Sequence, residues 1–139
     1  MYATSPKIVL LASALLSALL VIDGYQSEIL VQPNGQKSHN LIIGHPRPGD
    51  SLLFDLNVYV PRKLFRIVEK EIKFPSHGSY NNKYITSVQC WDGKTDGTGA
   101  FVTLRSGGLG AKNVTILFKS QRSHGIHHSV KIYGSYYRK

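Results

Sequence analysis

Apolar and polar residues alternate along most of the chain after residue 50. A period of two is typical of a β-strand that buries one face. In residues 51–60 the apolar face consists of Leu52, Phe54, Leu56, Val58 and Val60. Comparable short runs, separated by Gly and Pro, recur at residues 41–43, 84–91, 100–105, 114–119 and 129–133. This rhythm predicts one all-β domain, a single antiparallel β-sandwich or barrel-like fold of six to seven strands.

Residues 64–74 are the ambiguous part of this pattern. Phe65 and Ile67 lie on one parity, whereas Val68, Ile72 and Phe74 lie on the other. A β-bulge near residues 67–68 would reconcile the two sets. A helix also accommodates part of the spacing, but the flanking strands favour a strand here as well.

The N-terminal 24 residues have the pattern of an export signal. Lys7 is followed by an uncharged run of apolar and small residues, 8–22. Such a run is short for a membrane span and matches the apolar region of a secretory signal peptide. We expect residues 1–24 to be a cleaved signal helix, cut near Gly24, and the mature protein to be extracellular with no membrane span. An uncleaved N-terminal anchor is the alternative.

Residues 25–40 are polar and contain the turn signal Pro33-Asn34-Gly35. This composition predicts a flexible N-terminal arm. The folded β-domain is then expected to occupy residues 41–139.

The chain is strongly basic. It has 17 Lys and Arg against 8 Asp and Glu, so the net charge is +9. Loss of residues 1–24 would remove Lys7 and Asp23, leaving 16 and 7, and the net charge would still be +9. This excess favours anionic partners such as nucleic acid, sulfated glycans or acidic membranes, although a basic protein can also be positive for solubility alone.

Basic residues and tyrosines crowd the last third of the chain. Such interleaving suits phosphate contacts and base stacking, so non-specific nucleic-acid binding is one interpretation, and a solvated strand face is the other. The candidate anionic-partner face consists of Arg105, Lys119, Arg122, Lys131, Arg138 and Lys139.

Two residues carry expectations about covalent chemistry. Cys90 is the only cysteine, so the chain can form no internal disulfide, and we expect a buried, unpaired thiol. A disulfide to a second chain is the alternative. Asn113 begins the sequon Asn113-Val114-Thr115 and is the expected glycosylation site of an exported protein.

Three motifs suggest ligands only weakly. Residues 92–97 have a faint calcium-loop spacing, but strands flank them, and a hairpin connection explains them. Residues 107–110 are glycine-rich without a phosphate-loop ending, which indicates a β-turn. His124, His127 and His128 cluster without a local carboxylate or thiol, so turn and strand histidines explain them as well as a metal site does.

Catalysis requires a nucleophile beside a base, or paired carboxylates in a cleft. Most of the acids lie in turns or at outward strand positions. Cys90 with a histidine is the one conceivable pair, but the apolar neighbours on its strand favour a buried structural thiol. We therefore expect a protein that is no enzyme and needs no cofactor or metal.

An ordered series of motifs resembles the insect multiprotein bridging factor two family over residues 41–134. The motifs are Gly44-x-x-Arg47-Pro48-Gly49-Asp50, Ile85-Thr86, Asp92-x-x-Thr95-Asp96-Gly97-x-Gly99, Ser106-Gly107-Gly108-x-Gly110, Asn113-Val114-Thr115, Phe118-Lys119-Ser120-Gln121-Arg122-x-x-Gly125-Ile126 and Val130-x-Ile132-Tyr133-Gly134. The chain departs from the family at His127-His128, where a polar residue followed by an aromatic one is expected.

The resemblance implies two different roles. The family takes its name from a transcription coactivator that bridges a DNA-binding regulator and the general transcription machinery. Many members carry signal peptides and occur in saliva or venom. Because this chain has a leader pattern, we expect a secreted, non-enzymatic insect protein of saliva, venom or haemolymph that binds an anionic or protein partner. The coactivator role is the alternative.

Overall fold

The computed structural model describes residues 28–31, 35 and 37–138. They form eight strands: β1 (Glu28–Val31), β2 (Lys37–Gly44), β3 (Ser51–Val60), β4 (Glu69–Phe74), β5 (Tyr84–Asp92), β6 (Phe101–Gly107), β7 (Val114–Lys119) and β8 (Ile126–Ser135). The predicted all-β fold is confirmed. The predicted signal helix of residues 1–24 lies outside the described residues.

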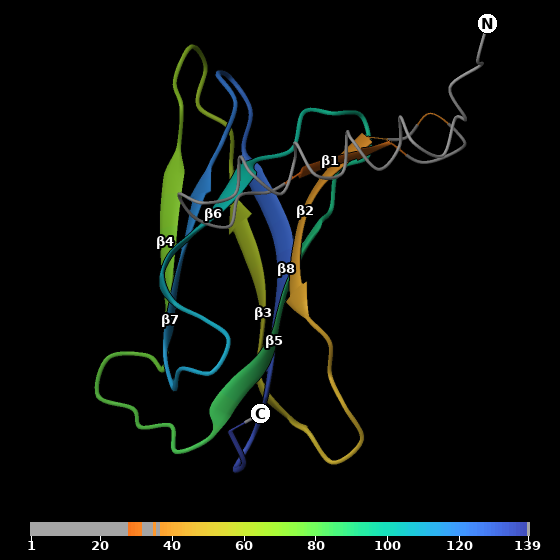
Figure 1. Cartoon of the computed structure of the whole chain (residues 1–139). Helices are drawn as coiled ribbons and strands as arrows, with labels where there is room; N and C mark the ends of the chain where they lie inside the picture. Colours follow the sequence, from red (N-terminus) through yellow and green to blue (C-terminus); the bar gives the residue numbers. More distant parts are fainter. Residues whose placement is uncertain (1–27, 32–34, 36, 139) are drawn as a thin grey trace, which may run out of the picture.

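The strands form two antiparallel sheets that pack face to face as a sandwich (Figure 1). The larger sheet has the order β1-β2-β5-β8-β3, and the smaller has the order β4-β7-β6. Every pair of neighbouring strands is antiparallel. Of the two predicted architectures, the structure is therefore the sandwich.

The alternation in the sequence explains how each sheet buries one face. In β8 the side chains of Val130 and Ile132 are fully buried, and in β7 those of Ile116 and Phe118 are fully buried, whereas the residues between them are not. These inward side chains meet between the sheets and exclude water, which is the main stabilising contribution in a domain of this size. No helix in the described part of the chain is long and apolar enough to cross a membrane.

The structure differs from the strand predicted for residues 64–74. Only Glu69–Phe74 forms strand β4, and residues 61–68 form a loop after Pro61, so neither a bulge nor a helix is present there. Val68, Ile72 and Phe74 keep one parity and are buried. The side chains that broke the alternation, Phe65 and Ile67, lie outside the strand and are exposed.

Part of the predicted flexible arm forms regular structure. Glu28–Val31 pairs with the start of β2 in the register Glu28↔Asn40 to Val31↔Lys37. β2 thus begins before the apolar run at residue 41, because Ser38 and His39 are buried and bonded to the 92–99 segment. This pair brings the number of strands to eight, one above the predicted range.

The strand directions sort the loops between two ends of the sandwich. Residues 61–68, 93–100 and 120–125 lie at one end, where β3, β5 and β7 finish (Figure 1). Residues 45–50, 75–83 and 108–113 lie at the opposite end with the C-terminus. The connection from β5 to β6 passes from one sheet to the other, so it is not the hairpin that the sequence predicts.

Candidate functional site

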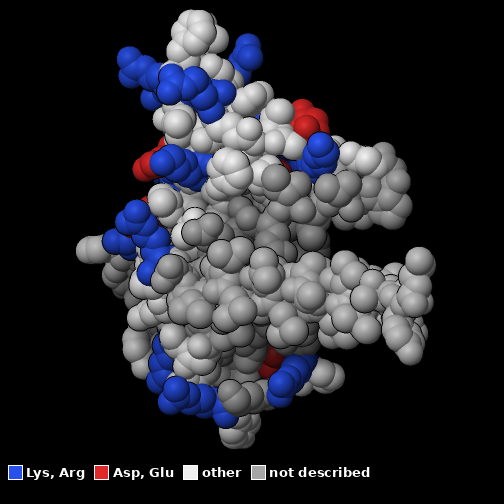
Figure 2. Space-filling view, turned by 45° about the horizontal axis from the view of Figure 1, so that its top comes forward, with Lys and Arg blue, Asp and Glu red and all other residues white. Residues whose placement is uncertain are grey.

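The loop between β3 and β4 exposes three large apolar side chains at one end of the molecule. Leu64 is 64% exposed, Phe65 is 72% exposed and Ile67 is 44% exposed. Four exposed cations surround them, namely Arg62, Lys63, Arg66 and Arg122. Figure 2 shows Lys and Arg side chains gathered around an uncharged projection at this end. We call residues 61–68 and 120–125 the basic tip.

The β7–β8 loop fixes the backbone of Phe65, the most exposed of the three apolar residues. The backbone N–H of Phe65 donates to Ser123 Oγ at 2.8 Å, and Arg122 Nη1 donates to the carbonyl oxygen of Phe65 at 3.1 Å. The backbone N–H of Ser123 donates to the carbonyl oxygen of Arg66 at 2.9 Å. These bonds join two loops that are more than fifty residues apart in sequence, so the shape of the tip is set before any partner binds.

A buried serine closes the base of the tip. The backbone N–H of Val68 donates to Ser120 Oγ at 2.8 Å, and the backbone N–H of Ser120 donates to the carbonyl oxygen of Val68 at 2.8 Å. Ser120 is 2% exposed. Gly125 is needed on the other side, because a Cβ there would collide with the carbonyl oxygen of Val60.

Backbone strain accompanies the exposure of the phenyl ring. Phe65 has φ of 59° and Ser123 has φ of 64°, both in the left-handed region. This conformation costs a non-glycine residue about 1–2 kcal/mol. The tip therefore holds a large apolar residue in water on a strained backbone, which is a combination that favours function over stability.

The tip carries no acidic residue. Neither residues 61–68 nor residues 120–125 contain Asp or Glu. At its base Lys119 Nζ lies 3.8 Å from Glu69 Oε1, with both side chains half exposed, so this pair is weak and offsets its own charges. The four cations of the tip thus form an unbalanced positive ring around the apolar residues.

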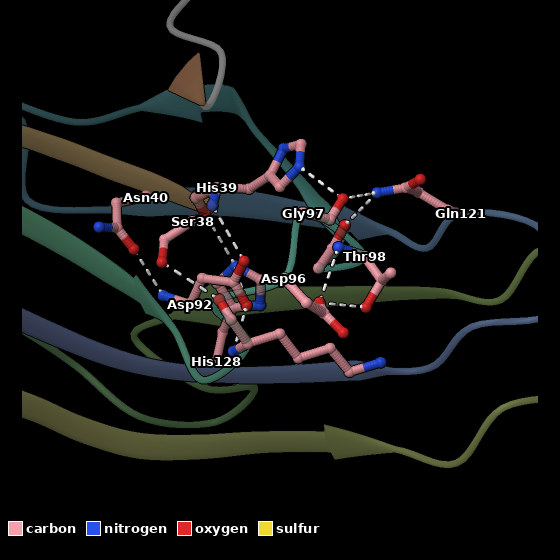
Figure 3. Close-up of polar contacts among 11 residues, drawn as sticks. Ser38, His39, Asn40, Asp92, Asp96, Gly97, Thr98, Gln121 and His128 are labelled. Atoms are coloured by element: carbon pink, nitrogen blue, oxygen red, sulfur yellow. Dashed lines mark hydrogen bonds and ion pairs between the residues drawn. The ribbon is translucent and has the colours of Figure 1, made fainter. Parts of the chain in front are cut away.

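A buried network around Asp92 supports this end of the sandwich (Figure 3). The backbone N–H groups of His39 and Lys94 each donate to the Asp92 carboxylate at 2.9 Å. The backbone N–H of Asp92 donates to Asn40 Oδ1 at 2.7 Å. Gly99 packs so closely on the carboxylate that any Cβ would overlap it. These contacts tie the start of β2 to the end of β5.

His128 completes the network from β8. Its Nε2 lies 3.1 Å from the carbonyl oxygen of His39 and 4.0 Å from Asp92 Oδ1, and the side chains of His128 and Asp92 are fully buried. Burial lowers the pKa of His128, and the His39 carbonyl and the Asp92 charge oppose this only in part. His128 is therefore neutral and donates Nε2–H to the His39 carbonyl, while its ring lies 5.2 Å from that of Phe118.

Gln121 connects the network to the basic tip. Its Nε2 donates to the carbonyl oxygens of Gly97 at 2.6 Å and Gly99 at 3.1 Å (Figure 3). His39 Nε2 lies 3.3 Å from the same Gly97 oxygen. The residue after Gln121 is Arg122, which holds Phe65. The segment Phe118–Gly125 that carried the family resemblance is thus the support of the tip.

The exposed end of the 92–99 segment is an Asx turn. Asp96 Oδ1 accepts hydrogen bonds from the hydroxyl and the backbone N–H of Thr98, and these lower the pKa of the Asp96 carboxyl. Within the described part of the chain, no three His, Cys, Asp or Glu side chains are grouped to hold a metal ion. The structure also separates the adjacent histidines of β8, because His127 is exposed against Tyr59 and His128 points into the core.

Two other shared motifs meet at the opposite end. Asp50 Oδ2 accepts hydrogen bonds from the Arg47 backbone N–H and from Thr86 Oγ1, both at 2.8 Å. A cavity of about 280 Å³ lies there, lined by Gly44, His45, Arg47, residues 84–86, Leu109 and Gly110. These contacts give residues 44–50 the role of a rigid turn.

The predicted anionic-partner face is not one surface. Lys119 lies on the outer side of the small sheet, whereas Lys131 lies on the outer side of the large sheet, in register with Asp55 and Gln89. Arg105 is exposed on β6 and Arg138 follows β8 at the far end, while Lys139 lies outside the described residues. Only Arg122 of the six belongs to the basic tip. Lys119 and Lys131 are close in sequence, but they lie on opposite outer faces because β7 and β8 belong to different sheets.

Neither Asn113 nor Cys90 belongs to the basic tip. Asn113 is exposed just before β7, at the opposite end of the sandwich. Cys90 is fully buried in β5, and burial raises the pKa of its thiol to about 12. The thiol is therefore protonated and shielded in the folded protein.

The sequence pattern missed Arg62, Lys63, Leu64, Phe65 and Arg66, because apolar residues there were interpreted as one face of a strand. Two signals were available. Pro61 separates this segment from the preceding strand, and the parity of the apolar residues changes at Val68.

Comparison with known proteins agrees with the motifs that frame this site. The sequence profile of a family described as "Transcription activator MBF2" matches residues 43–134. A protein of the bumblebee Bombus ignitus, described as a "Probable salivary secreted peptide", is 43% identical over 103 residues, which cover 74% of this chain and 75% of the bumblebee protein. No solved structure matches the chain.

Proposed function

This chain belongs to the family described as Transcription activator MBF2, and on that premise we propose that it is a secreted, non-enzymatic insect protein that binds an anionic partner through its basic tip. The observation that carries the proposal is the unbalanced ring of four exposed cations around three exposed apolar side chains.

Two features support secretion. The bumblebee relative is described as a probable salivary secreted peptide. The uncharged run of residues 8–22 behind Lys7 has the composition of an export signal. Cleavage of that segment leaves the net charge at +9, so the cations remain available to the mature protein.

The chemistry of the polar groups supports a binding role rather than catalysis. Asp92 and His128 form the most buried pair of titratable groups described, and their side chains are fully shielded from solvent. The carboxylate is occupied by backbone N–H groups, and a substrate has no access to it. Cys90 is protonated and equally shielded. None of these groups is placed to attack a bound molecule.

A coactivator role is the second candidate, and the family description favours it. It would bring the same basic tip to a protein or nucleic-acid partner inside the nucleus. The two roles differ in where the chain is found and in whether residues 1–24 remain attached.

Expression of the full chain in insect cells tests the proposal. We expect the protein in the medium, with a new N-terminus near residue 25. We also expect it to be retained on at least one of three anionic supports (heparin, duplex DNA and vesicles that contain phosphatidylserine), with retention that falls as salt is raised. Intact chain in nuclei would favour the coactivator role. If the protein binds none of the three supports, the binding proposal is overturned.

A further inference from the structure

We propose that the basic tip docks on the surface of anionic phospholipid membranes, with Leu64, Phe65 and Ile67 entering the interfacial layer and the surrounding cations resting on the headgroups. This inference rests on the proposed function, because it names the anionic partner of the same site.

The apolar residues of the tip favour a bilayer over water. Leu64 and Phe65 are 64% and 72% exposed, and Ile67 beside them is 44% exposed. They project from a loop held by hydrogen bonds to Ser123 and Arg122, so they cannot turn back into the core without breaking those bonds. Large apolar side chains at a convex tip are buried when they enter the boundary between headgroups and acyl chains.

The charges around these residues match a negatively charged surface. Arg62, Lys63 and Arg66 flank the apolar residues in the same loop, and Arg122 approaches from the β7–β8 loop. Each cation near an anionic leaflet strengthens binding about fivefold. The acid closest in sequence is Glu69, whose carboxylate faces Lys119 at the base, and the acid of the neighbouring 93–100 loop is Asp96, which is bonded to Thr98. Neither belongs to the basic tip.

Other anionic partners use only part of this surface. A sulfated glycan or a nucleic acid neutralises the cations, but it leaves Leu64 and Phe65 in water. A bilayer satisfies both sets of side chains, because its headgroups meet the ring of cations and its interfacial layer accepts the apolar residues. The combination of the two sets on one rigid loop is the reason for choosing the membrane.

The geometry predicts peripheral, reversible attachment. Three apolar side chains and four cations bind far more weakly than a membrane-spanning segment. Binding should therefore require anionic lipid and should decrease with rising salt, because the headgroup attraction is screened within about 10 Å at moderate ionic strength.

The experiment compares the full chain and four variants, all made in insect cells, by cosedimentation with vesicles. One vesicle contains phosphatidylcholine and phosphatidylserine in equal parts, and the other contains phosphatidylcholine alone. Phe65→Asn removes the ring, and the combined variant Arg62→Gln, Lys63→Gln, Arg66→Gln removes three charges. Tyr80→Asn and Lys112→Gln are the matched controls, since both residues are exposed at the opposite end.

We expect the wild-type chain to sediment only with the vesicles that contain phosphatidylserine. Phe65→Asn should weaken binding about five- to tenfold, and the triple variant should weaken it about a hundredfold. The two controls should bind as the wild type does. A change of Phe65 to Trp in a Trp91→Phe background should also give an emission shift to shorter wavelength on binding, whereas Tyr80→Trp in that background should not.

Two results would overturn the inference. If the wild type does not bind the vesicles but binds heparin or duplex DNA through its cations, the membrane assignment is wrong and the proposed function still holds. If vesicle binding is the same in the tip variants and the controls, the tip is not the contact surface. If the protein binds none of the three supports, the proposed function is overturned as well.

Discussion

Arg122 and Phe65 are joined by a hydrogen bond from the guanidinium to the carbonyl oxygen, at 3.1 Å, across 57 residues of sequence. One cation of the basic tip thus holds the backbone from which the tip's most exposed apolar ring projects. The residue after Arg122, Ser123, holds the N–H group of the same Phe65. Both polar groups of one exposed residue are therefore fixed by the β7–β8 loop, which is an arrangement suited to a preformed contact surface.

Replacing Phe65 should separate its roles in strain and in exposure. Phe65→Asn places a residue that tolerates positive φ at φ of 59° and should raise the free energy of unfolding by about 1 kcal/mol. Phe65→Ala also removes the ring but keeps the strain, so it should leave stability within about 0.5 kcal/mol of the wild type. Urea unfolding monitored through Trp91 measures both. Equal stability of the two variants would show that the backbone at residue 65 is not strained.

Gln121 should contribute to stability through the 92–99 segment. Gln121→Ala removes the amide donor from the carbonyl oxygens of Gly97 and Gly99. Because the Gly97 oxygen keeps His39 Nε2 at 3.3 Å, the loss should destabilise the fold by about 1 kcal/mol. Asn82→Ala, at an exposed loop position, is the control and should change stability by less than about 0.5 kcal/mol. If both variants unfold at the same urea concentration, the bridge from the network to the tip contributes nothing measurable.

His128 should make the protein less stable in mild acid. Burial lowers its pKa in the folded state, whereas the unfolded chain has the ordinary value near 6.5. Below about pH 6.5 the unfolded state takes up a proton that the folded state does not, so the free energy of unfolding should fall by up to about 1.4 kcal/mol per pH unit. The fall ends once the pH drops below the folded-state pKa.

The test is a series of urea unfolding curves over this pH range. His128→Phe removes the titrating group and should remove its part of the slope, whatever its effect on stability at neutral pH. His77→Phe, at an exposed loop position, should keep the slope of the wild type. The groups around His128 in the fold are Asp92, His39 and His127, and none of them changes in either variant. An unchanged slope in His128→Phe would place the acid sensitivity elsewhere.

The strands could be predicted from sequence because their alternation reflects a buried face. In β7 and β8 the inward residues are apolar at every second position or nearly so, and burial follows that period. β3 follows it only in part, because Val58 is buried whereas Leu52 and Leu56, which the pattern places on the same face, are exposed. The rule fails at Leu64 and Phe65, because it assumes that apolar residues are buried. At the basic tip they are exposed, and only the hydrogen bonds from Arg122 and Ser123 show how they are held there.

The buried polar network could not be predicted from the sequence, for a different reason. Asp92 and Gly97 were visible as parts of a motif, but their partner His39 lies 53 residues from Asp92 in the chain. An aspartate in a glycine-rich segment is compatible with a turn or an ion site, and only the fold brings the N–H of His39 to it. The same holds for the anionic face, because periodicity alone does not reveal that β7 and β8 belong to different sheets.

Cys90 should be unreactive in the folded protein. Its thiol is fully buried and its pKa is about 12, so almost no thiolate exists at neutral pH. We expect no labelling by Ellman's reagent until urea unfolds the chain, and a monomer on non-reducing electrophoresis. A disulfide-linked dimer, or labelling of the folded protein faster than its unfolding, would contradict the buried position.

Asn113 provides a prediction about the end of the sandwich opposite the tip. The residue is exposed before β7, so an oligosaccharide attached to it would extend into solvent away from residues 61–68. We expect protein secreted by insect cells to be heavier than its sequence and Asn113→Gln to lose the increment. Because the glycan and the basic tip lie at opposite ends, Asn113→Gln should keep the vesicle affinity of the wild type. A marked change in that affinity would mean that the membrane contacts the end that bears Asn113, and the orientation argued from Phe65 and its cations would be reversed.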